Sequence, residues 1–475
     1  MNPIGFEDFW YNSPLFVVVI AGLMVLILEG IRRKNTTASY LVGVLGLVIA
    51  LVLTGATYGS PKATFNGMMS QGAYGSYFSA LFVIVGLFSI VIARNYLSHF
   101  GSHHGEYYAL ILLAVSGMML MASGTDLIII FLGIELMSLA FYILAGFFRA
   151  KTTSNESALK YFLLGAFATG FLLYGIALLY GVTGSTNLAV IAANAAPLAN
   201  EPLFLLGVGM LTIALGFKVA AVPFHMWAPD VYEGAPTAVT GFMATAGKAA
   251  AFAAFGAVFF NGFAFSGTDV NALLAILAAL SMIVGNVTAV VQNNVKRMLA
   301  YSSVAHAGYI LSGIAAGNAE GQTGMMFYVG AYAFMTLGAF TIVGILEGDD
   351  GKGLTYADYT GLGSRNPIAA FLMAIFMFSL AGIPPMAGFF GKYYVFLAAV
   401  KADMTWLAVV GVLTSLVSVY YYLRLVVEMY FREEVPAVSI RPSGGSLVIA
   451  ALAAFMVVQF GIYPSILLTL INGGF

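Results

Sequence analysis

Two stretches of this sequence decide how the chain folds, and both place proline inside a long apolar segment. Residues 216–225 read GFKVAAVPFH, and residues 381–392 read AGIPPMAGFFGK. Proline lacks a backbone N–H group and clashes with the preceding helical turn, so Pro223 and the pair Pro384 and Pro385 predict a broken helix in each stretch. Inside a membrane, backbone groups freed at such a break must face protein or a hydrated cavity. The simpler interpretation is that these prolines only kink packed helices.

The composition around these stretches is that of a membrane protein. Of 475 residues, 61% are hydrophobic and 8% are charged, whereas an ordinary soluble domain has about 25% charged residues. Apolar segments long enough for a spanning helix recur along the whole chain, and the short alternating segments of a membrane barrel do not. The sequence therefore predicts an all-α polytopic membrane protein. Fourteen spans are expected, at residues 14–31, 39–57, 74–93, 107–123, 125–148, 158–181, 203–226, 236–261, 269–291, 298–316, 323–346, 367–400, 404–430 and 445–471.

The basic residues between these spans predict how the chain is oriented. Lys and Arg accumulate in loops that stay on the inner side of a membrane. With the N-terminus outside, only Lys62 and Lys401 fall in outer loops. We therefore expect both termini on the outer side of a bacterial inner membrane, with a thylakoid membrane as the alternative. The basic residues at inner positions are Arg32, Arg33, Lys34, Arg94, Arg149, Lys151, Lys160, Lys296, Arg297, Lys352, Arg365, Arg432 and Arg441.

The two proline breaks lie five predicted spans apart, which predicts an internal repeat. Because five is odd, the second copy would cross the membrane in the opposite direction, and inverted repeats of this kind place an ion or substrate site at the breaks. We expect one membrane domain over residues 1–475. It would contain N-terminal spans at 14–93, a first repeat at 107–261, a second repeat at 269–430 and a last span at 445–471.

Four basic residues remain inside the predicted spans: Lys218, Lys248, Lys392 and Arg424. A charge in the bilayer centre is costly, so an intramembrane lysine or acid indicates a functional site. Glu135, in the fifth span, is the best candidate partner for Lys218, and a lysine that alternates between paired and unpaired states is a proton site of adjustable affinity. Lys248 lies among small residues, and Lys392 follows the second break. The alternatives are a structural ion pair, a protonated acid that bonds a neighbouring helix, and lysines held by backbone carbonyls.

Histidines and a further ion pair complete the candidates. His306, inside the tenth span, is predicted to relay protons between deeper lysines, although a buried histidine can also be a simple helix contact. His225 is a secondary candidate near the inner mouth of the seventh span. Arg424 and Glu428 are four residues apart and are expected to form a surface pair. The chain has no cysteine and no metal-ligand or nucleophile motif, so we expect no metal site, no redox cofactor and no nucleic-acid partner in this chain.

Three stretches give the chain a family resemblance. They read DLIIIFLGIELMSL over residues 126–139, FKVAAVPFHMWAPDVYEGAPT over residues 217–237, and NVKRMLAYSSVAHAGY over residues 294–309. All three resemble the antiporter-like membrane subunits of proton-pumping NADH:quinone oxidoreductase, respiratory complex I. The second stretch is long enough to be specific to this superfamily, and the resemblance extends from about the second span to the C-terminus.

This resemblance implies fourteen helices with inverted repeats of five, and it implies a role for each candidate. Glu135 and Lys218 match the acid–lysine pair, Lys248 the central lysine, His306 the relay, and Lys392 the residue that faces the next subunit or the exit. The implied function is proton translocation coupled to quinone reduction in partner subunits.

Within the family, the chain is most similar to the N type. A lysine rather than a glutamate at position 392 argues against the M type, and the chain ends without the long lateral helix expected of the L type. The length and residues 358–367, DYTGLGSRNP, fit the N type. The resemblance implies an M-type subunit, small hydrophobic subunits and lipid as partners, with flavin, iron–sulfur clusters and quinone in other subunits.

Two other functions stay open at this point. One is a subunit of a multisubunit sodium/proton antiporter, which would use similar buried lysines without quinone reduction. The other is a stand-alone secondary transporter whose broken helices bind a small anion.

Overall fold

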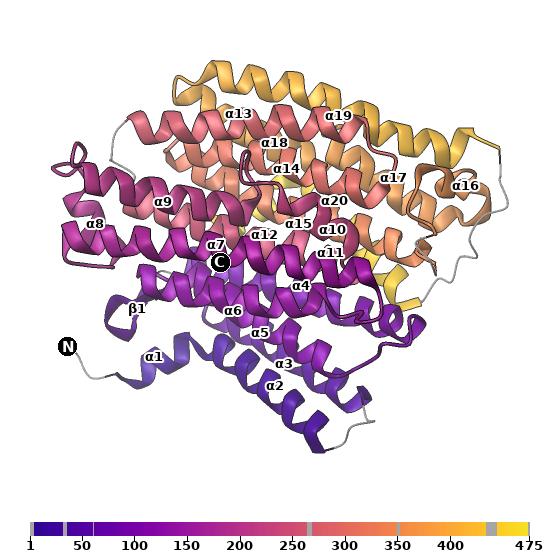
Figure 1. Cartoon of the computed structure of the whole chain (residues 1–475), viewed down its shortest axis with the longest axis horizontal. Helices are drawn as coiled ribbons and strands as arrows, with labels where there is room; N and C mark the ends of the chain where they lie inside the picture. Colours follow the sequence, from indigo (N-terminus) through magenta and orange to yellow (C-terminus); the bar gives the residue numbers. More distant parts are fainter. Residues whose placement is uncertain are drawn as a thin grey trace.

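The computed structural model describes residues 4–31, 36–59, 61–263, 268–348, 352–433 and 444–473. It is a bundle of long helices that run side by side (Figure 1). Four of the basic residues used for orientation, Arg32, Arg33, Lys34 and Arg441, lie outside the described residues, as do the last residues of both termini.

The first half of the chain begins with helices that lie along one side of the bundle, at the bottom of Figure 1. A short antiparallel hairpin, in which Lys62 pairs with Gln71, is inserted after the third helix. The elements of this half are α1 (Phe6–Tyr11), α2 (Ser13–Ile31), α3 (Thr36–Ala56), β1 (Lys62–Thr64), η1 (Phe65–Gly67), β2 (Met69–Gln71), α4 (Ala73–His99), α5 (Glu106–Ser123), α6 (Leu127–Ala145), α7 (Thr152–Thr183), α8 (Leu188–Ala195), α9 (Pro202–Val219), α10 (Trp227–Gly234), α11 (Thr237–Phe242), the π-helical turn η2 (Met243–Gly247), α12 (Lys248–Gly256) and the π-helical turn η3 (Ala257–Gly262).

The second half consists, over its described residues, of helices joined by short loops and turns. Its elements are α13 (Thr268–Val290), α14 (Val295–Ala315), α15 (Ala319–Leu346), η5 (Tyr356–Tyr359), α16 (Leu362–Arg365), α17 (Pro367–Ala381), α18 (Ala387–Lys401), α19 (Thr405–Phe431), α20 (Gly444–Ile462) and α21 (Pro464–Ile471).

Among the described residues, twelve helices are long and apolar enough to cross a membrane, with α11 to η3 counted as one. The other two predicted spans correspond to α14 and to the pair α17 and α18. Each helix of that pair has only 15 residues, because the span at 367–400 is divided at its break. The prediction of an all-α polytopic membrane protein is confirmed.

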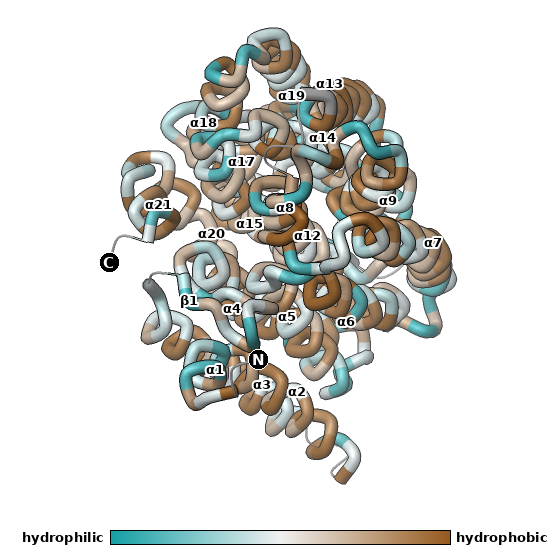
Figure 2. The backbone as a smooth tube through the Cα atoms, turned by 90° about the vertical axis from the view of Figure 1, so that its left-hand side faces the viewer, coloured by the Kyte–Doolittle hydropathy of each residue, from teal (hydrophilic) through white to brown (hydrophobic). Residues whose placement is uncertain are grey.

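The helices fall into an interior set and a peripheral set. The apolar window of α11 to η3 is 100% buried and that of α15 is 89% buried, whereas those of α3, α7 and α19 are 33% buried. Seen end-on, α12 and α15 lie in the middle of the bundle, and α2, α7 and α13 lie at its outside (Figure 2). In a membrane the peripheral faces would meet lipid, so the polar groups of the interior helices are kept away from it.

Both predicted helix breaks are present. The helix α9 ends at Val219, and Pro223 lies in the link to α10; α17 ends at Ala381, and Pro384 and Pro385 lie in the link to α18. Each helix ends in a left-handed residue, which closes the last turn with backbone hydrogen bonds and leaves the chain free to change direction.

Each half of the chain contains one member of a matched pair of contacts. Asp126 caps α6 and forms an isolated bridge with Asn187, while Asn294 caps α14 and bridges Thr355. Both pairs of counterparts are separated by the same 168 residues, from 126 to 294 and from 187 to 355. The predicted division into repeats at 107–261 and 269–430 agrees with this spacing and remains a prediction.

Candidate functional site

The predicted ionisable residues come from five different helices. Glu135 lies on α6, Lys218 on α9, Lys248 at the start of α12, His306 on α14 and Lys392 on α18. Glu135 is half-buried, and the other four side chains are buried.

Lys218 and Glu135 are close to the same turn of α6 but do not contact each other. The Lys218 Nζ donates to Ser138 Oγ at 2.7 Å, and Ser138 lies one turn beyond Glu135. The Glu135 carboxylate instead accepts a hydrogen bond from Thr169 Oγ1 on α7 at 2.7 Å. In this structure a serine hydroxyl therefore occupies the place that sequence reasoning assigned to the carboxylate.

Lys248 is held by a single residue of α14. Its Nζ donates to the Ser303 carbonyl oxygen at 2.8 Å and also contacts Ser303 Oγ. The π-helical turn η2 directly precedes Lys248, and such turns occur frequently at functional sites. A Cβ added at Gly247 would lie 2.5 Å from the Phe141 ring, so the small neighbour predicted for Lys248 is required by close packing.

His306 has a tyrosine hydroxyl at each ring nitrogen. Nδ1 lies 2.9 Å from Tyr328 Oη on α15, and Nε2 lies 3.0 Å from Tyr422 Oη on α19. Lys248 binds Ser303, one turn before His306, and Lys392 lies near the Tyr309 ring that packs against the imidazole, although neither lysine bonds to the imidazole in the described part of the chain. The histidine therefore lies between the two lysines but reaches them through other groups.

Lys392 is bound by the second helix break. Its Nζ donates to the carbonyl oxygens of Leu380 and Ala381, at 3.2 and 2.9 Å, and to Ser415 Oγ at 2.7 Å. An ammonium group has three hydrogens to donate, so all three have acceptors. The nitrogen also lies 5.0 Å from the centre of the Tyr309 ring. This arrangement agrees with the alternative that carbonyls hold an intramembrane lysine.

The secondary candidates have different outcomes. His225 is buried in the link between α9 and α10, and its Nδ1 has no hydrogen-bond partner among the described residues. The predicted pair of Arg424 and Glu428 is wrong. Arg424 instead donates to the Gln292 carbonyl and to Asn293 Oδ1, at 3.3 and 3.2 Å, because α19 faces the end of α13 at this level. Glu428 accepts from Thr360 on the loop before α16.

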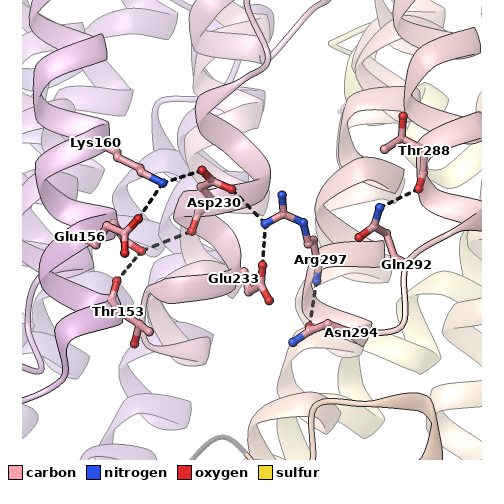
Figure 3. A network of polar contacts seen from close by, with 10 residues as sticks. Thr153, Glu156, Lys160, Asp230, Glu233, Thr288, Gln292, Asn294 and Arg297 are labelled. Atoms are coloured by element: carbon pink, nitrogen blue, oxygen red, sulfur yellow. Dashed lines mark hydrogen bonds and ion pairs between the residues drawn. The ribbon is translucent and has the colours of Figure 1, made fainter.

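A network of ion pairs that sequence reasoning missed joins the first broken helix to its neighbours (Figure 3). Asp230 of α10 accepts from Lys160 of α7 at 2.8 Å and from Arg297 of α14 at 2.9 Å. Arg297 also binds Glu233 at 2.6 Å, and Lys160 binds Glu156 at 2.7 Å. These residues line a cavity of about 600 Å³ on the predicted inner side.

The charge of Asp230 is set by this network. Partial burial opposes ionisation of the carboxyl, but hydrogen bonds from Lys160 and Arg297 outweigh that effect and hold the pKa of Asp230 below its usual value. Sequence reasoning used Lys160 and Arg297 only as markers of orientation. The acidic and basic residues present together in α7, α10 and α14 were the sequence signal that could have predicted these ion pairs.

No group of three His, Asp or Glu side chains that could bind a metal is found within the described ranges. The site is thus composed of buried lysines, a histidine, one half-buried acid and hydroxyl groups. Two broken helices in a membrane bundle and intramembrane ionisable residues with polar partners define the class: an antiporter-like, ion-translocating membrane protein.

Comparisons with known proteins identify the family. The family model described as "NADH:quinone oxidoreductase/Mrp antiporter, TM" matches residues 123–418. The chain is 46% identical to NADH-quinone oxidoreductase subunit N 1 of Chloroherpeton thalassium, over 97% of each chain. It is 45% identical to subunit N of Trichlorobacter lovleyi, over 96% of this chain and 94% of the other. A chain of respiratory complex I from Thermus thermophilus with bound aureothin superposes with a TM-score of 0.84 at 36% identity, covering 96% of this chain and 98% of that one.

The chain belongs to the subunit N family of NADH-quinone oxidoreductase, the proton-translocating antiporter-like membrane subunits of complex I. It is a multi-pass membrane protein of a bacterial respiratory complex, whose partner subunits carry the redox cofactors. The family model alone also covers Mrp antiporters, so the identity to subunit N over nearly the whole chain decides between the predicted functions.

Proposed function

We propose that this subunit moves protons along Glu135, Lys218, Lys248, His306 and Lys392 while its complex reduces quinone. The observation that carries the proposal is the placement of His306 between two buried lysines: Ser303, which binds Lys248, lies one turn before it, and the Tyr309 ring lies against both the imidazole and Lys392. A buried cation that served only packing would have no reason to be repeated on three different helices, because each one costs free energy to desolvate.

The proposed first step is a change in the contact between Glu135 and Lys218. With Ser138 as its acceptor, Lys218 has only a neutral partner. Approach of the Glu135 carboxylate would stabilise the ammonium form, and its withdrawal would favour release of a proton toward Lys248. Thr169, which binds Glu135 on the far side, holds the carboxylate in the withdrawn position.

The proposed second step carries the proton from Lys248 to Lys392. Lys248 bonds Ser303, which lies one turn before His306 on α14. His306 accepts and releases the proton, and Lys392 receives it beside three hydrogen-bond acceptors. His225 is proposed as a secondary group at the first break.

The position of the subunit in its complex is also a proposal. We infer an M-type antiporter-like subunit and small hydrophobic subunits as neighbours, and flavin, iron–sulfur clusters and quinone in the other subunits. We infer the bacterial inner membrane as its location, with both termini outside. The basic residues Arg94, Arg149 and Lys151, which lie at one end of the bundle's helices, support this orientation.

The test is Lys248→Ala in the assembled complex, in sealed vesicles. We expect proton translocation driven by quinone reduction to fall by about 10²-fold or more, the usual contribution of a proton-transfer group. Lys401→Ala, which removes an exposed pair with Glu320, is the matched control and should translocate normally. Undiminished translocation by the Lys248→Ala complex would overturn the proposal.

A further inference from the structure

The proposed path has a gap between His306 and Lys392 that the predicted residues do not fill. The ring of Tyr309 lies between them: its centre is 5.5 Å from that of the His306 ring, and Lys392 Nζ lies 5.0 Å from it on α18. An aromatic face attracts a cation but cannot take up and pass on a proton. Asn286 donates to the Tyr309 hydroxyl at 2.9 Å and so holds the ring in this position. A direct transfer across the gap is therefore blocked.

The same two residues are connected indirectly through α19. Tyr422 of α19 bonds His306 Nε2 at 3.0 Å, and Ser415 of α19 bonds Lys392 Nζ at 2.7 Å. Both end points of the gap thus contact one helix. Ser418 lies between these two positions and is fully buried; its hydroxyl donates to the Ser415 carbonyl at 2.6 Å.

The three hydroxyl residues share one face of α19. Positions 415, 418 and 422 are spaced i, i+3 and i+7, which places them in a single stripe along a helix. The residues on the opposite face are apolar or aromatic and exposed: Leu416 at 70% and Tyr420 at 60%. The stripe is therefore turned to the interior, where Ser418 and Tyr422 are buried.

We propose that Tyr422, Ser418 and Ser415 form the proton connection between His306 and Lys392, and that α19 is thereby a working part of the path. This inference rests on the proposed function. Hydroxyl groups suit the task because each one both donates and accepts a hydrogen bond. Seven residues of helix rise by about 10 Å, so water molecules would bridge the serines between the two ends.

Each transfer leaves the hydroxyls unchanged. Imidazolium Nε2–H of His306 gives a proton to Tyr422 Oη as the original phenol proton leaves for the next oxygen along the stripe. At the far end, a neutral Lys392 takes up one proton on Nζ. Tyr422 also contacts Ser302 of α14, so its hydroxyl turns from Ser302 toward Ser418 when the connection is in use.

The first experiment compares Ser418→Thr with Ser418→Val in the assembled complex. These two side chains have nearly the same shape and differ by one hydroxyl, so a packing role predicts equal effects. The proposal expects translocation by Ser418→Thr to stay within about twofold of the original, and that by Ser418→Val to fall about tenfold or more. Equal translocation by the two variants would overturn it.

The second experiment is Tyr422→Phe, with Tyr77→Phe as the control. Tyr77 is buried and loses one bond, to the Met326 carbonyl, outside the path. We expect translocation to fall about tenfold or more in Tyr422→Phe and to be unaffected in Tyr77→Phe. If the Tyr422→Phe complex does not assemble, the Ser418 pair decides. Normal translocation by Tyr422→Phe together with an inactive Lys248→Ala complex would overturn the α19 connection and leave the proposed function standing. Normal translocation by Lys248→Ala would instead remove the proposed function.

Discussion

The two helix breaks have almost the same backbone and use it differently. At the first break, Ala220 is left-handed with φ 59°, and the Ala221 N–H bonds the Gly216 carbonyl at 2.8 Å. At the second, Gly382 is left-handed with φ 84°, and the Ile383 N–H makes the equivalent bond to a carbonyl five residues earlier at 3.0 Å. Both helices therefore end by the same hydrogen-bond pattern.

The carbonyls freed at the two breaks have different partners. At the first break, the Phe217 carbonyl accepts from the indole Nε1 of Trp227 at 2.8 Å. At the second, two freed carbonyls bind the Lys392 ammonium. A neutral indole therefore satisfies a freed carbonyl at the first break, whereas a cation satisfies the two freed carbonyls at the second.

The charged residue at the same position after each break has the opposite sign. Ten residues after the left-handed residue stands Asp230 at the first break and Lys392 at the second. Asp230 is fixed by ion pairs at the edge of a cavity, and Lys392 is enclosed. The same backbone conformation therefore precedes a helix that ion pairs hold in place in the first half, and it forms a binding site for a cation in the second half.

The largest expected difference is between Lys392→Met and Lys218→Met. Both should abolish translocation. Lys392→Met also leaves two buried carbonyls without their donor. Lys218→Met removes a donor only from the Ser138 hydroxyl, which keeps its own hydrogen bond to the Ile134 carbonyl. Since an unsatisfied buried group costs about 1–3 kcal/mol, the Lys392 variant should be less stable than the Lys218 variant by about 2 kcal/mol. Thermal unfolding of the two purified complexes measures this, and equal midpoints would contradict the assigned role of the carbonyls.

Exchanging the left-handed residues tests the breaks themselves. Gly382→Ala puts a Cβ 3.0 Å from the Lys392 side chain and a side chain at φ 84°, so it should destabilise by about 1–2 kcal/mol and reduce translocation. Ala220→Gly relieves the same backbone cost but adds freedom to the unfolded chain, so its net effect should stay below about 1 kcal/mol. The same unfolding measurement compares them, and a harmless Gly382→Ala would show that Lys392 does not restrict the second break and that both breaks tolerate alanine at this position.

The ion pairs at Asp230 should contribute less. Arg297→Ala leaves the Lys160 contact in place, and the side chains of Lys160, Asp230 and Arg297 are 30–42% exposed. We expect a loss below about 1 kcal/mol, and a similar value for the coupling in a double-mutant cycle with Asp230→Asn. A coupling indistinguishable from zero would mean that packing alone holds α10 against α14.

The smallest expected effect is on pH dependence. Because the pKa of Asp230 is lowered in the folded chain, the unfolded chain binds its proton first, and stability from this group is present above the ordinary Asp pKa of about 3.9. It is lost as the pH falls from there through the folded value. Asp230→Asn should flatten this part of the stability profile below about pH 4, whereas Glu156→Gln, at the rim of the same network, should change it less.

Much of this architecture could be predicted because it depends on single residues. Long apolar segments must be spans, prolines within them must interrupt hydrogen bonding, and a lysine inside a span must find polar partners. Arg424 shows where this reasoning fails. The spacing to Glu428 suggested a local pair. Arg424 instead binds the carbonyl of Gln292, which follows α13 and lies 132 residues away in the chain. No local sequence pattern contains that contact.

The partners of the ionisable residues were the main omission. Ser138, Ser303, Tyr328 and Tyr422 have no sequence signal, since serine and tyrosine are tolerated in any membrane helix and this chain has 26 tyrosines. Their importance comes only from the atoms they face. The same holds for the gap between Glu135 and Lys218, which Ser138 fills.

The residue types alone specify which groups enter the membrane and where the helices break, because the cost of desolvating a charge and the missing N–H of proline belong to the residues themselves. Which acceptor each cation has depends on how the helices pack. Distance sets that choice, and distances between α6, α9, α14, α18 and α19 exist only once the helices have packed.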